Sequence, residues 1–252
     1  MSNPALSVSD DPGHPILQTI ADDDGMLVQG VPVEEARKHY FDVGRSALRC
    51  VRLALAAAER TEVRKILDLP CGHGRVMRAL RAAHPRSEIH ACDLLTAGVE
   101  FCRAQLGAVP IPSDPDPKKV RLKGPYDLIW VGSLFTHFEA SRWPAFLQLL
   151  HSSLAVGGVC VVTAHGRWAA ELVRNGTTGY GLTDPGRLLP PYDREGFSYL
   201  PYDPTAGYGV SLSAVPWVTS QIGQLKQARM VLMLERGWAD HQDVYAWQRV
   251  DW

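Results

Sequence analysis

The sequence predicts a doubly wound α/β fold built on a mostly parallel sheet. Nearly continuous apolar runs, such as 66–69 and 159–162, are typical of parallel strands that are buried on both faces. Segments of helical periodicity lie between these runs, and a glycine-bearing turn follows the first of them. A length of 252 residues with 46% apolar residues suffices for one large domain with a full core.

The expected elements alternate along the chain. Strands are expected at 63–69, 88–92, 126–131 and 159–163, with a short one near Ala108. Helices are expected at 34–60, 75–83, 96–105 and 141–154. Gly44 is a point where the first helix could break, and Gly157-Gly158 is interpreted as the C-cap of the last. The proline-rich stretch 110–117 is expected to be a loop.

The chain is expected to form a terminal arm and one domain. The parts, in order, are a flexible arm (1–30), a helical cap (31–60), a cofactor-binding core (61–168), a substrate-side insertion (169–228) and a C-terminal hairpin (229–252). The hairpin is expected because two strand-like runs, 230–235 and 244–250, lie close together. Within the insertion, 175–204 is too long for a simple connection and is a candidate lid.

Composition and charge disfavour several classes of protein. A net charge of -1 gives no field that would recruit nucleic acid or an anionic membrane. The five scattered cysteines suit reduced thiols, and no signal-like or membrane-spanning apolar stretch is present, so a cytoplasmic protein is expected. No metal site is expected, and the run Asp22-Asp23-Asp24-Gly25 is interpreted as a solvated turn because other EF-hand ligands are missing. A homodimer is one candidate assembly.

A strand, a glycine-bearing turn and a helix follow one another at 66–75, the arrangement that binds a nucleotide-like ligand. Gly72 and Gly74 let the backbone approach such a ligand, and the N–H groups at the helix start favour a carboxylate or phosphate. Asp93 ends the next strand, where it can accept two hydrogen bonds from a ribose diol. Leu94 offers an apolar surface for an adenine ring. These features fit both a nicotinamide dinucleotide and S-adenosylmethionine.

Two residues separate these ligand classes. Met77 stands where the third glycine of a dinucleotide turn belongs, and no Tyr-x-x-x-Lys pair lies on a helix. Asp68 lies inside the turn, where a negative charge suits an ammonium or sulfonium better than a pyrophosphate. S-adenosylmethionine is therefore the better match, and an NAD(P)-dependent Rossmann oxidoreductase is the alternative.

The ordered motifs resemble those of the class I S-adenosylmethionine-dependent methyltransferases. The turn at 66–74 resembles motif I, although Pro70 replaces its first glycine, and 126–130 and 154–159 resemble the fourth strand and the approach to the fifth. The resemblance implies a Rossmann-like fold with S-adenosylmethionine as cofactor. It also implies contacts to the cofactor from Asp68, Pro70, Cys71, Gly72, Gly74, Asp93, Leu94, Ser113, Asp114, Gly132 and Ser133.

Residues after the strand ends are candidates for the acceptor side. His137 follows the fourth strand and is the leading candidate for a general base, with packing beneath the loop as an equal alternative. His165 follows the fifth strand as a second catalytic candidate, or as a residue that only orients the backbone. The candidates for binding the substrate are Tyr40, Arg45, Tyr208 and Trp217.

We therefore expect a methyltransferase that acts on oxygen or nitrogen of a small-molecule or sugar-containing acceptor. The protein mainly has to align the acceptor with the methyl group, since the sulfonium already activates that carbon. A non-catalytic S-adenosylmethionine-binding protein is a second alternative, which would gain if Trp217 or the N-terminal arm filled the acceptor pocket.

Overall fold

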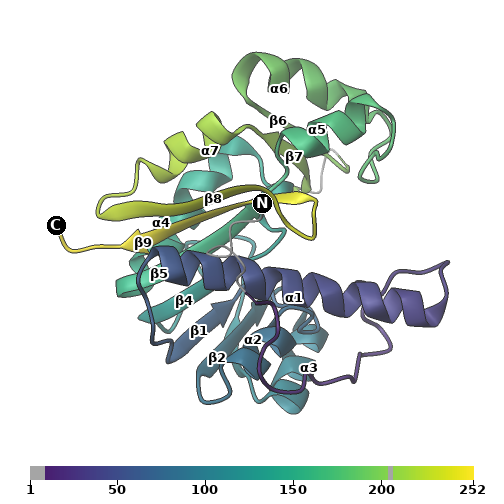
Figure 1. Ribbon diagram of the computed structural model, residues 1–252. Helices are drawn as coiled ribbons and strands as arrows, with labels where there is room; N and C mark the ends of the chain where they lie inside the picture. Colours follow the sequence, from purple (N-terminus) through teal and green to yellow (C-terminus); the bar gives the residue numbers. More distant parts are fainter. Residues whose placement is uncertain (1–8, 204–206) are drawn as a thin grey trace, which may run out of the picture.

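A seven-stranded sheet forms the centre of the protein in the computed structural model, which describes residues 9–203 and 207–252 (Figure 1). The strand order is β3-β2-β1-β4-β5-β9-β8; β1 to β5 run parallel, and β9 is antiparallel to both of its neighbours. The strands are β1 (Lys65–Asp68), β2 (Glu88–Asp93), β3 (Val109–Pro112), β4 (Tyr126–Val131), β5 (Leu154–Ala164), β8 (Ala228–Trp238) and β9 (Gln242–Arg249). The predicted fold class, a mostly parallel sheet that ends in an antiparallel hairpin, is confirmed.

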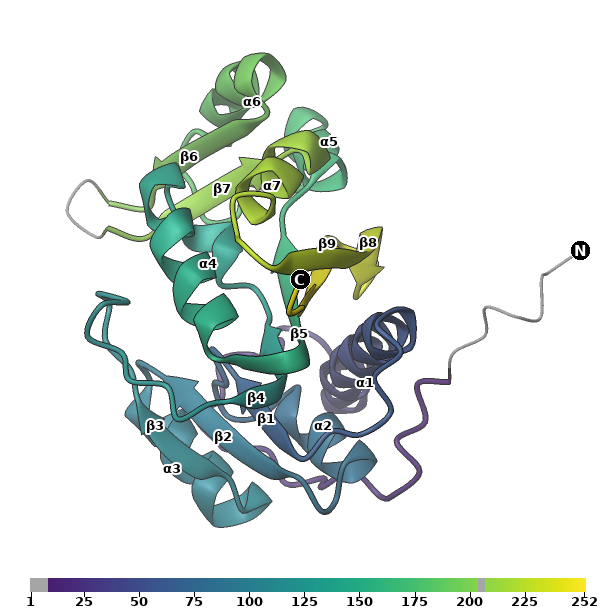
Figure 2. The ribbon, with the colours of Figure 1, turned by 90° about the vertical axis from the view of Figure 1, so that its left-hand side faces the viewer.

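Helices cover both faces of this sheet, and α1 and α4 lie on opposite sides of it (Figure 2). On one face the core contains residues of α1 (Val33–Ala57), α2 (Met77–Ala83) and α3 (Thr96–Leu106). On the other face it contains residues of α4 (Trp143–Ser152) and α7 (Val215–Ile222). In β1, Ile66 packs on the first face and Leu67 on the second. Both faces of a strand are therefore apolar, which explains the unbroken apolar runs in the sequence.

The segment between β5 and β8 forms a small layer above the sheet (Figure 1). Besides α7, it contains α5 (Arg167–Arg174), the 3-10 turn η4 (Pro185–Leu188), α6 (Leu189–Glu195), and the antiparallel pair β6 (Phe197–Pro201) and β7 (Gly209–Ser213). Its own apolar core is built from Ala169, Ala170, Leu188, Val210 and Leu212. Much of the predicted lid at 175–204 is thus helix and strand; Pro204 lies outside the described residues.

Two expectations about glycine positions are wrong. Helix α1 does not break at Gly44; a Cβ there would lie 2.6 Å from the carbonyl oxygen of Arg75, so glycine lets α1 approach the turn after β1. Gly157 and Gly158 do not cap α4, because they lie inside β5. The register with β4 shifts there, and a Cβ on Gly158 would lie 2.5 Å from the carbonyl oxygen of Tyr126.

The proline-rich stretch also differs from expectation at its start. Pro110 and Pro112 belong to β3 and are in register with Ala91 and Asp93 of β2. Strand β3 is the edge of the sheet, where a missing N–H donor is tolerated on the unpaired side. The loop therefore begins after Pro112.

The described part of the N-terminal arm runs along the body of the protein. Ile16 is buried in the core beneath α1 and α2, and Arg52 of α1 donates hydrogen bonds to the carbonyl oxygens of Ser9 and Asp11. Residues 1–8 lie outside the described residues, so the flexible arm stays a prediction. Within the described ranges, no helix is long and apolar enough to cross a membrane.

The close contact at Gly44 makes a stability prediction. We expect Gly44→Val to lower the free energy of unfolding by about 1–3 kcal/mol, because the added side chain meets backbone that cannot move aside cheaply. His39→Val, on the exposed face of the same helix, is the control and should change stability by at most about 0.5 kcal/mol. Urea unfolding curves measure both, and equal losses in the two variants would contradict the packing argument.

Candidate active site

The turn after β1 keeps its expected conformation despite Pro70. Gly72 and Gly74 adopt φ values of +49° and +78°, which favour glycine, and the Leu69–Pro70 peptide bond is cis. The N–H of Gly74 donates to the carbonyl oxygen of Cys71, which closes the turn. The backbone at Gly72 therefore lies open beside the carboxyl ends of β1 and β2.

Asp93, at the end of β2, fixes this turn from the side. Its Oδ2 accepts a hydrogen bond from the N–H of Gly72 at 2.7 Å, and its Oδ1 accepts one from the N–H of Leu95 at 2.9 Å. A carboxylate has about four lone-pair sites, so each oxygen can accept one more hydrogen bond. Asp93 is therefore both a support of the turn and a fixed acceptor for a pair of hydroxyl groups.

Two adjoining cavities open at these strand ends. The first, of about 410 Å³, lies beside the glycine turn, and the second, of about 1020 Å³, extends toward the loop after β3. Their shared lining residues are Pro70, Asp93, Leu95, Ser133 and Tyr208. A ligand with a nucleoside part and a charged tail could therefore occupy both cavities, with Asp93 at the junction.

Asp68 lines the first cavity, and neither of its carboxyl oxygens has a hydrogen-bond partner among the described residues. Burial raises the pKa of Asp68 well above its ordinary value, and the negative charge of Asp93 raises it further. A buried carboxyl group without partners is costly, so it fits a ligand that brings hydrogen-bond donors or a positive charge.

His137 lines the first cavity in a defined tautomer. Its Nδ1 lies 2.7 Å from the carbonyl oxygen of Gly209 in β7, and since a carbonyl only accepts, Nδ1 carries the proton. Nε2 is then the free acceptor of the neutral ring, and burial lowers the pKa of His137. The ring of Tyr208 stacks on the imidazole at 4.5 Å. The arrangement holds a neutral imidazole ready to take a proton.

His165 lies apart from the cavities. It is buried at the end of β5, its ring packs against Tyr180 at 4.5 Å, and its backbone carbonyl accepts from the N–H of Ser213 in β7. Burial, with nearby His241 and His137, lowers the pKa of His165 to about 3. It lines neither cavity, so its position fits the alternative in which it orients the backbone.

Ser133 stands between the two cavities in a conformation that is unusual for a residue with a side chain. Its φ is +58°, and its N–H donates to Oγ1 of Thr163 at 2.8 Å. Gln242 of β9 accepts from Thr163 at 2.6 Å and donates to Oγ of Ser133 at 3.0 Å. The ends of β4, β5 and β9 are thus joined, which holds the strained residue at the site.

The remaining sequence candidates divide into two groups. Cys71, Gly72 and Gly132 line the first cavity, and Leu94, Ser113 and Asp114 line the second. Gly74 and the substrate candidates Tyr40, Arg45 and Trp217 line neither cavity.

The reason is different for each of these four. A Cβ on Gly74 would lie 2.6 Å from the side chain of Leu106, so this glycine permits packing against α3. Tyr40 is fully buried, Arg45 pairs with Asp42 on the surface of α1, and Trp217 stacks on Phe197 in the insertion.

Sequence reasoning missed several cavity residues, among them the charged residues Arg75, Asp24 and Arg142. Arg75 directly follows the glycine turn, a position that could have suggested it. Asp24 comes from the arm, where no local pattern indicates burial. Arg142, in the 3-10 turn η3 (Ala140–Arg142), donates to the carbonyl oxygens of Pro115 and Gly207 and so joins the loop after β3 to the insertion beside the second cavity.

The sheet, the turn and the acid at the end of β2 define a protein of the Rossmann-like class that binds an adenosine-containing ligand. Residues 67–160 match a family model described as a methyltransferase domain, and no curated protein sequence matches the chain. The segment 67–160 thus matches a methyltransferase domain, and the fold around it is shared with solved S-adenosylmethionine-dependent methyltransferases.

Solved structures share this fold at low sequence identity. An S-adenosylmethionine-dependent methyltransferase from Clostridium acetobutylicum superposes with a TM-score of 0.54 at 12% identity, over 85% of this chain and 92% of that one. An O-methyltransferase family protein from Burkholderia thailandensis gives 0.54 at 15% identity, over 87% and 60%. The N-methyltransferase NodS from Bradyrhizobium japonicum, in complex with S-adenosyl-L-homocysteine, gives 0.52 at 14% identity, over 92% and 94%.

The burial of His165 predicts an acid-sensitive fold. Because burial lowers its pKa from 6.5 to about 3, His165 binds a proton in the unfolded chain at pH values where it stays neutral in the folded chain. The free energy of unfolding therefore falls as the pH drops below about 6.5. We expect His165→Asn to lose less stability than the wild type between pH 7 and pH 4, measured by urea unfolding.

Asp243 acts in the opposite direction in part of this range. Burial raises its pKa from 3.8 to about 6, so its contribution to stability falls as the pH rises from 3.8 to 6. Comparing the wild type with His165→Asn at each pH cancels this contribution and those of the other histidines. Parallel stability curves for the two proteins would rule out the role of His165.

Proposed function

We propose that the chain is a class I S-adenosylmethionine-dependent methyltransferase with S-adenosylmethionine as its cofactor. We further propose that it methylates a hydroxyl oxygen of a small-molecule acceptor, sugar-containing precursors included, with His137 as the general base. The observation that carries the proposal is the hydrogen bond from Nδ1 of His137 to the carbonyl of Gly209. It leaves Nε2 as the proton acceptor of a ring that lines the first cavity. An amine acceptor would have no need of such a base once neutral, whereas a hydroxyl gains from one.

The residues around the cavities fit S-adenosylmethionine. Asp93 offers two oriented oxygens to a ribose diol, and the second cavity presents Leu94 and Ser113 to an adenine ring. Asp68 is a buried carboxyl group without a partner among the described residues beside the first cavity, which suits a ligand that brings hydrogen-bond donors or a positive charge. When bound, this cofactor supplies a methyl carbon that the sulfonium makes electrophilic.

The side chains of the protein have three tasks in the transfer. Ser133, held by Thr163 and Gln242, fixes the backbone at the junction of the cavities. His137 would take the proton of the acceptor hydroxyl at Nε2 while that oxygen receives the methyl group of the donor, which leaves as the neutral thioether S-adenosylhomocysteine. Tyr208, itself 44% exposed, stacks on the imidazole of His137 and so limits the orientations of that ring.

Two other readings find less support. Met77 is fully buried in the core, where it fills the space that a dinucleotide turn gives to its third glycine. A non-catalytic binding protein is disfavoured because Trp217 packs against Phe197 and Trp143 instead of entering a cavity. The arm contributes Asp24, Gly25 and Met26 to one wall of the first cavity, whose volume is still about 410 Å³.

The proposal extends to compartment and partners. We infer a cytoplasmic enzyme, which the five free and buried cysteines favour. A net charge of -1 gives no support to a nucleic-acid or membrane partner, so a small molecule is the proposed one. The proposed organisation is one methyltransferase domain with a helical cap, in which the insertion and the arm lie beside the site, and a homodimer stays a candidate assembly.

Calorimetry tests the ligand class. We expect S-adenosylmethionine and S-adenosylhomocysteine to bind and NADH not to bind. Asp93→Ala should make the binding free energy of both adenosyl ligands less favourable by about 1.5–3 kcal/mol, because it removes a charged hydrogen-bond acceptor and a support of Gly72. The control is Glu100→Ala on the exposed face of α3, which should bind like the wild type. Binding of NADH without either adenosyl ligand would overturn the class of cofactor.

Substitution of His137 tests the base. With an acceptor found by screening hydroxyl compounds against a methyl-labelled donor, His137→Ala should lower kcat about 10²–10⁴-fold and leave the affinity for S-adenosylhomocysteine unchanged. Because burial lowers the pKa of His137, wild-type kcat should decline only at pH values below 6.5, as the ring takes up a proton. Undiminished turnover of the variant would remove His137 from catalysis and favour an amine acceptor.

A further inference from the structure

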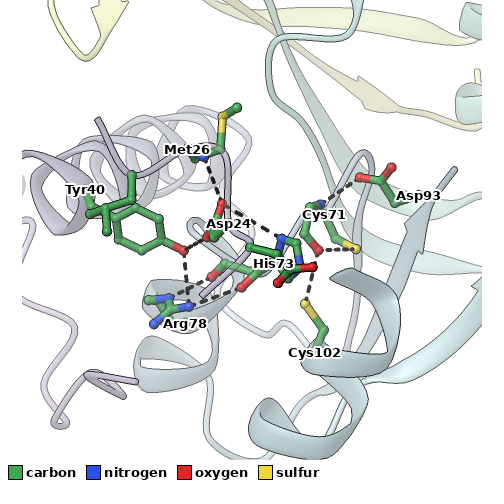
Figure 3. Close-up of polar contacts among 12 residues, drawn as sticks. Asp24, Met26, Tyr40, Cys71, His73, Arg78, Asp93 and Cys102 are labelled. Atoms are coloured by element: carbon green, nitrogen blue, oxygen red, sulfur yellow. Dashed lines mark hydrogen bonds and ion pairs between the residues drawn. The ribbon is translucent and has the colours of Figure 1, made fainter. Parts of the chain in front are cut away.

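The acidic run at the end of the arm does not form a fully solvated turn. Asp24 is only 5% exposed and lines the first cavity, whereas the side chain of the adjacent Asp23 is 68% exposed. Two hydrogen bonds orient the carboxylate of Asp24 (Figure 3): Oδ2 accepts from the hydroxyl of Tyr40 at 2.6 Å, and Oδ1 accepts from the N–H of Met26 at 3.0 Å. The expectation of a solvated turn is therefore wrong for Asp24.

Arg78 of α2 holds this part of the arm against the glycine turn (Figure 3). Its guanidinium donates to the carbonyl oxygens of Leu17 and Thr19 in the arm at 3.0 and 2.7 Å. It also donates to the carbonyl oxygens of His73 and Gly74 at 3.1 and 3.0 Å, and to the hydroxyl of Tyr40. The arm is thus a built wall of the cavity, positioned by the same side chain that braces the turn.

Arg75 brings a positive charge to the same cavity. Its guanidinium lies 6.0 Å from the ring centre of Trp238, and no ion pair with it is found in the described ranges. Burial lowers the pKa of Arg75, which nevertheless stays charged at any physiological pH. Asp24 and Arg75 therefore face one cavity with opposite charges and without a salt bridge to each other.

We propose that Asp24 and Arg75 bind the two charges at the amino-acid end of the methyl donor, Asp24 the ammonium and Arg75 the carboxylate. The inference rests on the proposed use of the first cavity for that end of the donor. The nucleoside part carries no charge, and nine of the eighteen residues that line the second cavity are leucine, proline or phenylalanine. Its one basic lining residue, Arg142, is already bonded to the carbonyl oxygens of Pro115 and Gly207, and its other charged residues are the acids Asp93, Asp114, Asp116 and Glu139. Of the other two acids of the first cavity, Asp93 supports the glycine turn, and neither oxygen of Asp68 has a hydrogen-bond partner among the described residues that would orient it as Tyr40 and Met26 orient Asp24.

Two ligands separate recognition of the charged end from all other effects. S-adenosylhomocysteine has the amino-acid end, and 5′-methylthioadenosine lacks it but keeps the adenosine and the thioether. Measured by calorimetry, Asp24→Asn should lower the affinity for S-adenosylhomocysteine about 10- to 100-fold. It should lower the affinity for 5′-methylthioadenosine less than about twofold. Arg75→Gln should show the same selectivity. Asp22→Asn, an exposed acid of the same run, is the matched control and should leave both affinities unchanged; Asp23 is unsuitable because it pairs with His73 of the first cavity.

A purely structural role for Asp24 predicts a different result. If Asp24 only anchors the arm, its substitution should lower the affinities for the two ligands to the same extent. Tyr40→Phe, which removes a hydrogen bond but no charge, should then lower these affinities as Asp24→Asn does. Equal weakening of both ligands, or no weakening of either, overturns the assignment of Asp24. If neither ligand binds the wild type, the proposed function itself fails, so the two failures are distinguishable.

Discussion

The shape of the site depends on the hydrogen bonds that the buried guanidinium of Arg78 donates. Arg78 is 1% exposed and makes five hydrogen bonds, which join the arm, helix α1 and the glycine turn at one point. Burying a charge costs several kcal/mol unless its donors are satisfied, so each of these oxygens is needed to keep the guanidinium in place. These hydrogen bonds fix the position of the arm, which carries Asp24, relative to the turn at Gly74. The cavity therefore keeps its shape through a polar contact beneath it.

The sequence was most informative where structure is determined locally. The runs of β1, β4 and β5 are apolar because both faces of each strand are buried, so their positions could be predicted to within a few residues. Gly72 and Asp93 could be predicted as a pair because the ends of adjacent parallel strands meet at one edge of the sheet. Pro70 did not prevent the turn, since the positive φ values fall on Gly72 and Gly74.

Features that depend on distant contacts could not be predicted. Asp24 lies in an acidic run that looks solvated, and its carboxylate is buried against the hydroxyl of Tyr40, which Arg78 bonds in turn from another element. His137 was chosen for its place after β4, but its tautomer is set by Gly209, 72 residues further along the chain. The insertion consists of short elements and is rich in glycine and proline, so its hydrophobic periodicity is weak.

Strand β7 links the insertion to the chemistry of the core. It accepts the hydrogen bond of His137 through Gly209, donates to the carbonyl of His165 through the N–H of Ser213, and bonds the carbonyl of Phe135 through Ser211. Under the proposed function, the insertion also lies on the acceptor side of the site. Selectivity for the acceptor and support of the proposed base would then depend on the same segment. A relative with a different insertion would need a new partner for the hydrogen bond that Gly209 accepts from His137. This requirement limits how far the preference for an acceptor can change while the base keeps its position.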